Sequence, residues 1–348
     1  MNAPDPDARM PKWQDRRIAT VLRVLFALLL CFGINDRSWA ADGVGLVDGA
    51  GTKIPGEAVE FHGGVVEAND VSGVAAVGDF LLIVSDEAKR PTIVQVLKKD
   101  GAAYEVVGSV PLPAGDDEVD LEAVTAEADM VYVTGSHSWS RNTNAGMVEQ
   151  PKRKASREQF FRFRLLADGT AGPVEGPKSL LPAILASPVL KGFVGIASKE
   201  NGIDIEGLAV KEGRLHFGFR GPVLRGGWVP VLSVAWDDPG GTGRMKYLQL
   251  DGRGIRDIAA VEGGFLVLAG PVGDSDQPFR IYFWDGADQL PGGENGPRPQ
   301  LLGEFTDLGK AKPEGLAVLQ ARGKTYDLLV VSDGLPKGGA TRWTLTRP

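Results

Sequence analysis

Short apolar runs, each divided by a tight turn, recur along residues 70–334 in a common pattern. Each copy has polar or acidic residues, a strand of small apolar residues, a turn, and a strand of bulkier apolar residues. With 47 glycines in the chain, this pattern is typical of short strands joined by tight turns. The five copies are "DVSGVAAVGDFLLIVSDE" (70–87), "VDLEAVTAEADMVYVTGSHS" (119–138), "IDIEGLAVKEGRLHFGFRGPVLRG" (203–226), "IRDIAAVEGGFLVLAGP" (255–271) and "KPEGLAVLQARGKTYDLLVVSDG" (312–334).

The copies are regularly spaced. Aligned on the small apolar strand, they share one polar column whose members are 50 to 57 residues apart, except for one interval of 84. A repeat of this length with several strands per copy predicts an all-β fold, a β-propeller. We expect five blades, with six as the second count, and a β-sandwich as the main alternative architecture. A sandwich does not explain the column, which consists of Ser72, Glu122, Glu206, Asp257 and Glu314.

The wide interval contains either a sixth blade or insertions, and the sequence favours insertions. Residues 159–174, "QFFRFRLLADGTAGPV", read as the outer hairpin of the second blade. Residues 178–194, "KSLLPAILASPVLKGFV", read as a short helix and a loop. We expect the ring to be closed by pairing between "AVEFHGGVV" (58–66) and the last strand, "TRWTLTRP" (341–348).

Residues 1–40 have the layout of a secretory signal peptide. Arg16 and Arg17 precede an apolar run over 21–34, and the small residues of a cleavage site end at Ala40. The run has about 14 residues, fewer than the roughly 20 of a membrane span, so a signal anchor is the weaker interpretation. We expect general secretion rather than twin-arginine export, cleavage after Ala40, and a periplasmic or secreted protein.

Cys31, the only cysteine, lies in that apolar run, so a chain cleaved after Ala40 has no disulfide and no cysteine nucleophile. The formal net charge is −7, and it is −9 for residues 41–348 because the first 40 carry six basic and four acidic side chains. An acidic protein is not expected to bind nucleic acid, but it is compatible with cations. We expect residues 41–348 to form a single propeller domain with no membrane span, large enough to bury its own core.

The strand order of a propeller blade brings charges that are distant along the chain to one mouth of the central channel. Blade strands are antiparallel, so the inner strand starts on the face where the second strand ends. Converging carboxylates can hold a hard cation such as Ca²⁺, which takes about six to eight oxygen ligands. The expected metal ligands are Glu122, Asp204, Glu206, Asp257 and Glu314.

Arginines at the same mouth can hold phosphate or carboxylate groups in bidentate fashion. The residues expected to bind a small anionic molecule are Arg141, Arg220, Arg225 and Arg256. Crowded carboxylates can also raise one another's pKa and act as acid or base. A histidine in a strand-end loop can likewise act as acid or base. The catalytic candidates are Glu206, Asp257 and His137. The competing interpretation is structural: the acids cap neighbouring blades and the arginines neutralise them.

The blade motifs resemble those of a known group of proteins. "DLEAV", "IEGLAV", "GFRGPVLRG", "LDGRGIRD", "LAGP" and "KPEGLAV" together resemble a family of secreted bacterial β-propellers of unknown function, over residues 65–332. More distantly, the "EGL" blade starts are similar to the esterase-like phytases and the calcium-dependent lactonase propellers. That likeness implies hydrolysis of phosphate or carboxylic esters, with Ca²⁺ in the channel. The first copy departs from the pattern, because Ser72 stands where the others have an acid.

The sequence therefore predicts an exported propeller with an acidic, arginine-bearing channel mouth. The expected function is divalent-cation-dependent hydrolysis of an anionic ester, phosphoester or lactone at that mouth. The alternative is a non-catalytic periplasmic propeller that binds a ligand or a protein and whose charged ring is structural.

Overall fold

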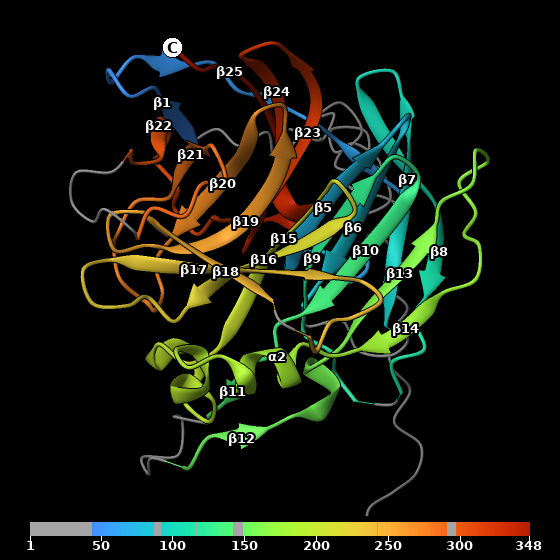
Figure 1. Cartoon of the computed structure of the whole chain (residues 1–348). Coiled ribbons are helices and arrows are strands. Elements are labelled where there is room, and N and C mark those ends of the chain that lie inside the picture. Colours follow the sequence, from blue (N-terminus) through green and yellow to red (C-terminus); the bar gives the residue numbers. More distant parts are fainter. Residues whose placement is uncertain (1–43, 87–91, 116, 142–148, 242, 291–296) are drawn as a thin grey trace, which may run out of the picture. The chain divides into compact units, whose positions relative to one another are not determined.

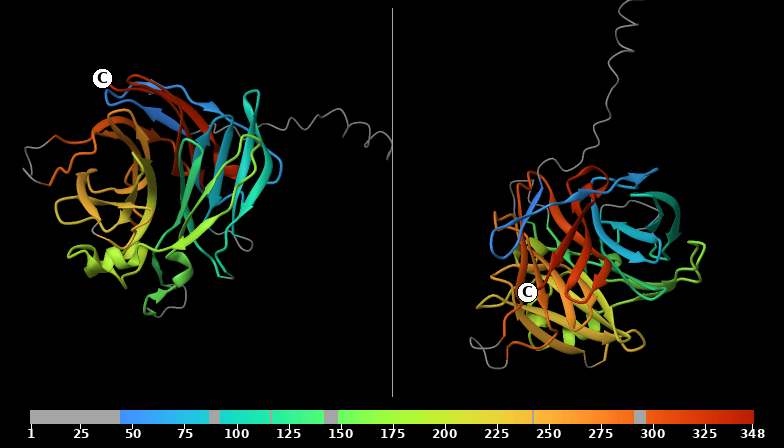
Figure 2. Two further views of the ribbon diagram at one scale, coloured as in Figure 1. Left: turned by 45° about the vertical axis from the view of Figure 1, so that its right-hand side comes forward. Right: turned by 90° about the horizontal axis from the view of Figure 1, so that it is seen from above.

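The computed structural model describes residues 44–86, 92–115, 117–141, 149–241, 243–290 and 297–348. Five β-sheets surround one axis (Figure 1), and two further views show the same sheets (Figure 2). Their inner strands contact one another in ring order, and the last contacts the first. The protein is a five-bladed β-propeller, which confirms the expected fold class and first blade count. The expected signal peptide lies outside the described residues.

Each blade is an antiparallel sheet whose first strand lies at the axis. From the axis outward, blade 1 contains β5 (Val71–Val77), β6 (Phe80–Ser85), β7 (Ile93–Asp100) and β8 (Ala103–Pro111). Blade 2 contains β9 (Leu121–Glu127), β10 (Met130–Gly135), β13 (Phe160–Arg164) and β14 (Glu175–Lys178). Blade 3 contains β15 (Asp204–Lys211), β16 (Arg214–Gly221), β17 (Trp228–Ala235) and β18 (Arg244–Gln249).

The last two blades follow the same order. Blade 4 contains β19 (Gly254–Val261), β20 (Gly264–Gly270), β21 (Arg280–Trp284) and β22 (Gln300–Thr306). Blade 5 contains β23 (Lys312–Arg322), β24 (Thr325–Asp333) and β25 (Thr341–Thr346), preceded by the 3₁₀ turn η5 (Pro336–Gly339).

The segment before blade 1 closes the ring by pairing with the edges of three blades. Its strands β1 (Gly45–Val47) and β2 (Lys53–Ile54) extend blade 4, since β1 pairs with β22. Next, β3 (Glu57–Ala58) pairs with β25 of blade 5, and β4 (Phe61–His62) pairs in parallel with β8 of blade 1. Ala58 lies opposite Thr341, so the predicted closure between the two ends of the propeller is confirmed.

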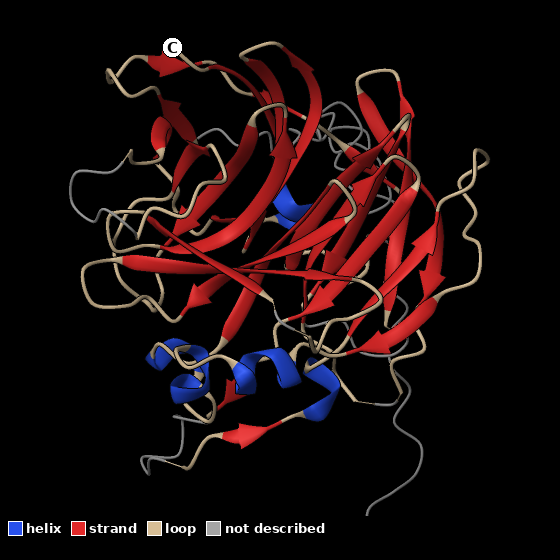
Figure 3. Ribbon diagram, viewed as in Figure 1, coloured by secondary structure: helices blue, strands red, loops and turns tan. Residues whose placement is uncertain are grey.

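The wide interval between the second and third repeats contains insertions, not a sixth blade. The predicted outer hairpin of blade 2 is present as β13 and β14. Short helices follow it, and Figure 3 shows them gathered at one side of the sheets. The inserted elements are β11 (Trp139–Ser140), β12 (Lys152–Arg153), η1 (Ala155–Arg157), α2 (Leu181–Ala186), η2 (Leu190–Phe193) and η3 (Ser198–Glu200).

Apolar side chains fill the five interfaces between blades. The bulky residues of the second strands pack there; Leu82, for example, shares a cluster with Val124 of the next blade. Equivalent clusters lie at the other interfaces. The inner strands are small because they crowd the axis. They leave a channel of only about 100 Å³, lined by apolar residues such as Ala75, Ala259 and Ala317.

Glycine in an inner strand permits the closest approach between blades. A Cβ atom at Gly315 would lie 2.9 Å from the backbone nitrogen of Val74 and 3.0 Å from the Cα of Gly73, in the neighbouring blade. Gly207 and Gly73 face similar contacts. The inner strands of the repeat therefore need small residues so that neighbouring blades can pack this closely.

We expect Gly315→Ala to destabilise the propeller by roughly 1–3 kcal/mol, because the added methyl group overpacks the contact between blades 5 and 1. Gly108→Ala is the matched control in an outer strand, where an added Cβ meets nothing within 4 Å. It should leave stability unchanged or slightly raised. Urea unfolding midpoints measure both effects, and equal midpoints for the two variants would contradict the packing argument.

Candidate functional site

Every inner strand carries a β-bulge at the same position near its start. In β15, for example, Ile205 pairs with Phe219 and Gly207 with Gly218, which leaves Glu206 as the extra residue. A bulge bends its strand and re-aims the extra side chain. We call the five extra residues the bulge ring: Ser72, Glu122, Glu206, Arg256 and Glu314.

The bulge ring corrects the polar column predicted from the sequence. In β19, Ile255 pairs with Ala269 and Asp257 with Leu268, so Arg256 is the ring member and Asp257 follows it. The Asp257 carboxylate accepts hydrogen bonds from the backbone N–H groups of Ile258 and of Leu316 in the neighbouring blade, each at 2.7 Å. Burial raises the pKa of Asp257, against the effect of these donors. This carboxylate thus joins blades 4 and 5.

The ring members other than Ser72 line a cavity of about 870 Å³ at the channel mouth, which we call the mouth cavity. Ser72 instead donates a hydrogen bond to the carbonyl of Leu121 in blade 2. The predicted meeting of strand starts and strand ends is confirmed, because Arg220 and Asp333, at the ends of β16 and β24, line the same cavity. Of its 26 lining residues, ten are acidic and six are basic, so the lining has a formal charge of −4.

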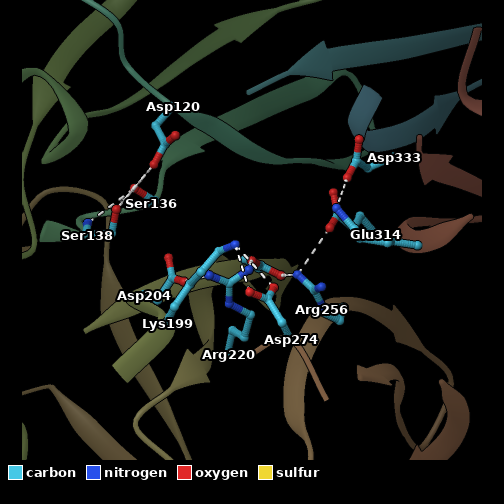
Figure 4. A network of polar contacts seen from close by, with 12 residues as sticks. Asp120, Ser136, Ser138, Lys199, Asp204, Arg220, Arg256, Asp274, Glu314 and Asp333 are labelled. Atoms are coloured by element: carbon cyan, nitrogen blue, oxygen red, sulfur yellow. Dashed lines mark hydrogen bonds and ion pairs between the residues drawn. The ribbon is translucent and has the colours of Figure 1, made fainter. Parts of the chain in front are cut away.

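Two arginines hold three of the acids at the cavity floor (Figure 4). Arg220 contacts Asp204 Oδ2 at 2.5 Å and Glu206 Oε1 at 2.6 Å. Arg256 contacts the other Glu206 oxygen at 2.5 Å and Glu314 Oε1 at 3.1 Å. Both oxygens of Glu206 are therefore paired. Burial raises the pKa of Asp204 and of Glu314 to about 7, although the arginines oppose that rise.

Glu122 is the exception among the floor acids. Its side chain is half-buried, and no Lys or Arg among the described residues lies within ion-pair distance of it. Burial raises the pKa of Glu122 well above its ordinary value, and the negative charges of Glu206 and Asp120 add to the effect. Carboxylate oxygens of Glu122, Asp204 and Glu206 lie within 4.8 Å of one another. These three residues can share a cation.

A second polar cluster adjoins this group in blade 2. Ser136 and Ser138 donate hydrogen bonds to Asp120, which lies in the left-handed region with φ = 57°. Arg157 pairs with Asp120 at 2.8 Å and also contacts Glu118. Arg157 comes from the basic insertion 151–159, whose sequence reads most simply as a solvated loop. The sequence gives no signal that Arg157 lines the mouth cavity, because its position depends on the path of the insertion.

The remaining site candidates lie outside the lining of the mouth cavity. His137 is buried: its Nε2 accepts the N–H of Leu180 at 3.1 Å, while Nδ1 donates to the carbonyl of Gly135. Burial lowers the pKa of His137 to about 4, so the ring is neutral and ties the helical insertion to blade 2. Arg141 pairs with Glu200 at 2.9 Å, and Arg225 is exposed in the turn between β16 and β17.

Fold and site together define a five-bladed propeller with a charged cavity at one mouth. The chain belongs to the family described as "Protein of unknown function (DUF3616)", whose model matches residues 70–162 and 170–342. The predicted resemblance to a propeller family of unknown function is thereby confirmed. No curated protein matches the chain. Within the described part of the chain, no helix is both long and apolar enough to cross a membrane.

The chain also matches solved structures at low identity. The chain is similar to the glutaminyl cyclase of Myxococcus xanthus, with a TM-score of 0.42 and 11% identity over 84% of this chain and 95% of that one. It is also similar to a hypothetical protein from Leishmania major, with a TM-score of 0.41 and 11% identity over 86% and 92% of the two chains.

We expect Glu314 to make the protein less stable as the pH rises from about 4.5 to 7. The pKa of its carboxyl is about 7 in the folded state against an ordinary 4.5, so in this window the folded state keeps a proton that the unfolded state has lost. Glu314→Gln should therefore flatten the pH dependence of the urea midpoint. The exposed control Glu105→Gln should keep the wild-type slope, and equal slopes for all three proteins would contradict this assignment.

Proposed function

We propose that the mouth cavity binds a divalent cation such as Ca²⁺ through Glu122, Asp204 and Glu206, and that the protein hydrolyses a small anionic ester, phosphoester or lactone there. One arrangement carries the proposal: oxygens of the three carboxylates lie within 4.8 Å of one another, and no Lys or Arg among the described residues lies within ion-pair distance of Glu122. Hard divalent cations prefer such carboxylate oxygens.

The charge of the mouth cavity supports a cation. Ten acidic and six basic residues line it, and like charges this close raise one another's pKa. A bound divalent ion would remove half of the formal charge of −4. It would also let Glu122 ionise beside Glu206. Ca²⁺ sites in extracellular proteins are commonly filled at about 10⁻⁴–10⁻³ M, which suits the proposed location in the periplasm or outside the cell.

The basic side chains of the cavity support the second part of the proposal, the binding and hydrolysis of an anionic substrate. Arg220 and Arg256 lie beside the three carboxylates, where an anionic group bound to the cation would meet their guanidinium groups. Glu314 has a pKa of about 7, which suits a general base at neutral pH. A bound cation would contribute by lowering the pKa of a water molecule. His137 and Asp257 take no part, since both are engaged with backbone groups.

A second candidate function is a non-catalytic propeller whose floor is a structural network. The pairing of both Glu206 oxygens with arginines favours it, because a fully paired buried carboxylate needs no ligand. The two candidates differ at Glu122, whose position the arginine network does not explain.

We expect Ca²⁺ to raise the melting temperature of the purified protein and EDTA to remove the rise. At a hundredfold excess over Kd the stabilisation is about 2.7 kcal/mol. Glu122→Gln should abolish the shift yet melt no lower without Ca²⁺, because it relieves repulsion and leaves both arginine networks intact. Glu105→Gln, an exposed control, should keep the shift. A shift that persists in Glu122→Gln, or no shift with any divalent ion, would refute this cation site.

We expect hydrolysis of a phosphomonoester, carboxylic ester or lactone to require the same cation. Glu122→Gln should abolish turnover, and Glu314→Gln should lower kcat by about 10²–10⁴, the range for loss of a general base. Release of p-nitrophenol or acid measures both. Cation binding without turnover of any of the three substrate classes would favour the non-catalytic propeller. Turnover that survives EDTA would contradict the proposed chemistry.

A further inference from the structure

An ion pair lies at the rim of the mouth cavity. Lys199 Nζ, in η3, contacts both oxygens of Asp274 at 3.1 and 3.3 Å, although the two residues are 75 positions apart. Figure 4 shows the pair in front of Asp204 and Arg220, the floor residues beneath it in this view. Both Lys199 and Asp274 line the cavity, so the contact joins two neighbouring segments of its rim, η3 before blade 3 and the loop after β20 of blade 4.

The loop that carries Asp274 has few other attachments. Residues 271–276 follow β20, and all six line the mouth cavity. None of them has regular secondary structure, and no backbone hydrogen bond joins them to other parts of the chain that the structure describes. Gly273 lies close to η3, since a Cβ there would be 3.3 Å from the carbonyl oxygen of Lys199. Among the described residues, the ion pair is thus the main polar attachment of this loop to η3.

This attachment is weak enough to open. The side chains of Lys199 and Asp274 are 65% and 80% exposed, and exposed ion pairs contribute little because water screens them. Each charge has an alternative partner when a ligand enters: an anion can pair with Lys199, and a cation with Asp274. The proposed cation could therefore pair with Asp274, and the proposed anionic substrate could pair with Lys199.

We propose that Lys199 and Asp274 form a latch between η3 and the loop 271–276, over the floor of the mouth cavity, which must open for ligand to enter or leave and so limits the rate of exchange. The part of this proposal that concerns ligand exchange rests on the proposed cation site. The latch itself is a contact between two loops and exists without any ligand.

The test with ligand measures Ca²⁺ release. Ca²⁺-loaded protein is mixed with a fluorescent chelator in a stopped-flow instrument. Lys199→Ala and Asp274→Ala should each release Ca²⁺ about two- to fivefold faster, the range expected for loss of an exposed ion pair. The charge-reversed double variant, Lys199→Asp with Asp274→Lys, should return the rate to within about twofold of wild type.

Two neighbours provide matched controls. Lys310 and Asp276 line the same rim, and neither forms an ion pair with another described residue. Lys310→Ala and Asp276→Ala should leave the release rate within about twofold of wild type, since they change rim charge without breaking the latch. Equal rates in all single variants, or no recovery in the reversed pair, would overturn the latch.

A ligand-free measurement separates failure of the latch from failure of the cation site. Spin labels on Ser275→Cys and Ser109→Cys, in a Cys31→Ser background, report the distance from the loop to blade 1. Lys199→Ala should widen this distance distribution, and the charge-reversed pair should narrow it again. If the protein binds no Ca²⁺ but the distribution widens, the latch stands and the proposed function falls. An unchanged distribution overturns the latch.

Discussion

The β-bulge near the start of every inner strand is the constraint on which the mouth depends. A regular strand sends alternate side chains to its two faces, whereas a bulge adds one residue and re-aims it. Five bulges at one register build the ring, and the residue after each must be small where the neighbouring blade approaches, as at Gly73, Gly207 and Gly315. In blade 4 that next residue is Asp257, whose carboxylate bonds to the neighbouring backbone instead.

The composition of the ring explains its uneven charge. Arg256 stands between the glutamates of blades 3 and 5 and contacts both Glu206 and Glu314. Glu122 has no such neighbour, because blade 1 contributes Ser72 and blade 3 contributes Glu206, already paired. Among the ring members, Glu122 of blade 2 is therefore the acid that has no ion-pair partner among the described residues. This local imbalance, rather than the number of acids, is the reason for placing a cation there.

The fold and the charged channel mouth could both be predicted from the sequence, because both follow from local patterns. Strand periodicity, glycine turns and the 50-residue spacing together predict a ring of antiparallel blades. The ring member of blade 4 was misassigned by one residue, since the alignment sought an acid and took Asp257 in place of Arg256. Arg157, Lys199 and Asp274 were missed because they lie on insertions and loops, whose paths are set by long-range contacts. His137 was predicted as a catalytic residue because it lies in a strand-end loop, but its imidazole ring is hydrogen-bonded to the backbone.

The structural and the cation-binding interpretations of the floor are compatible. A carboxylate is a useful ligand only if it is held in place, and the two arginines hold Glu206 in place through both of its oxygens. Breaking those pairs would leave buried charges uncompensated, so substitution of Glu206 affects folding and binding together. Glu122 lies outside the pairs, which makes it the position where the two roles separate. Among the described residues, a paired network on one side and a carboxylate without an ion-pair partner on the other make up the half-site that we propose for the cation.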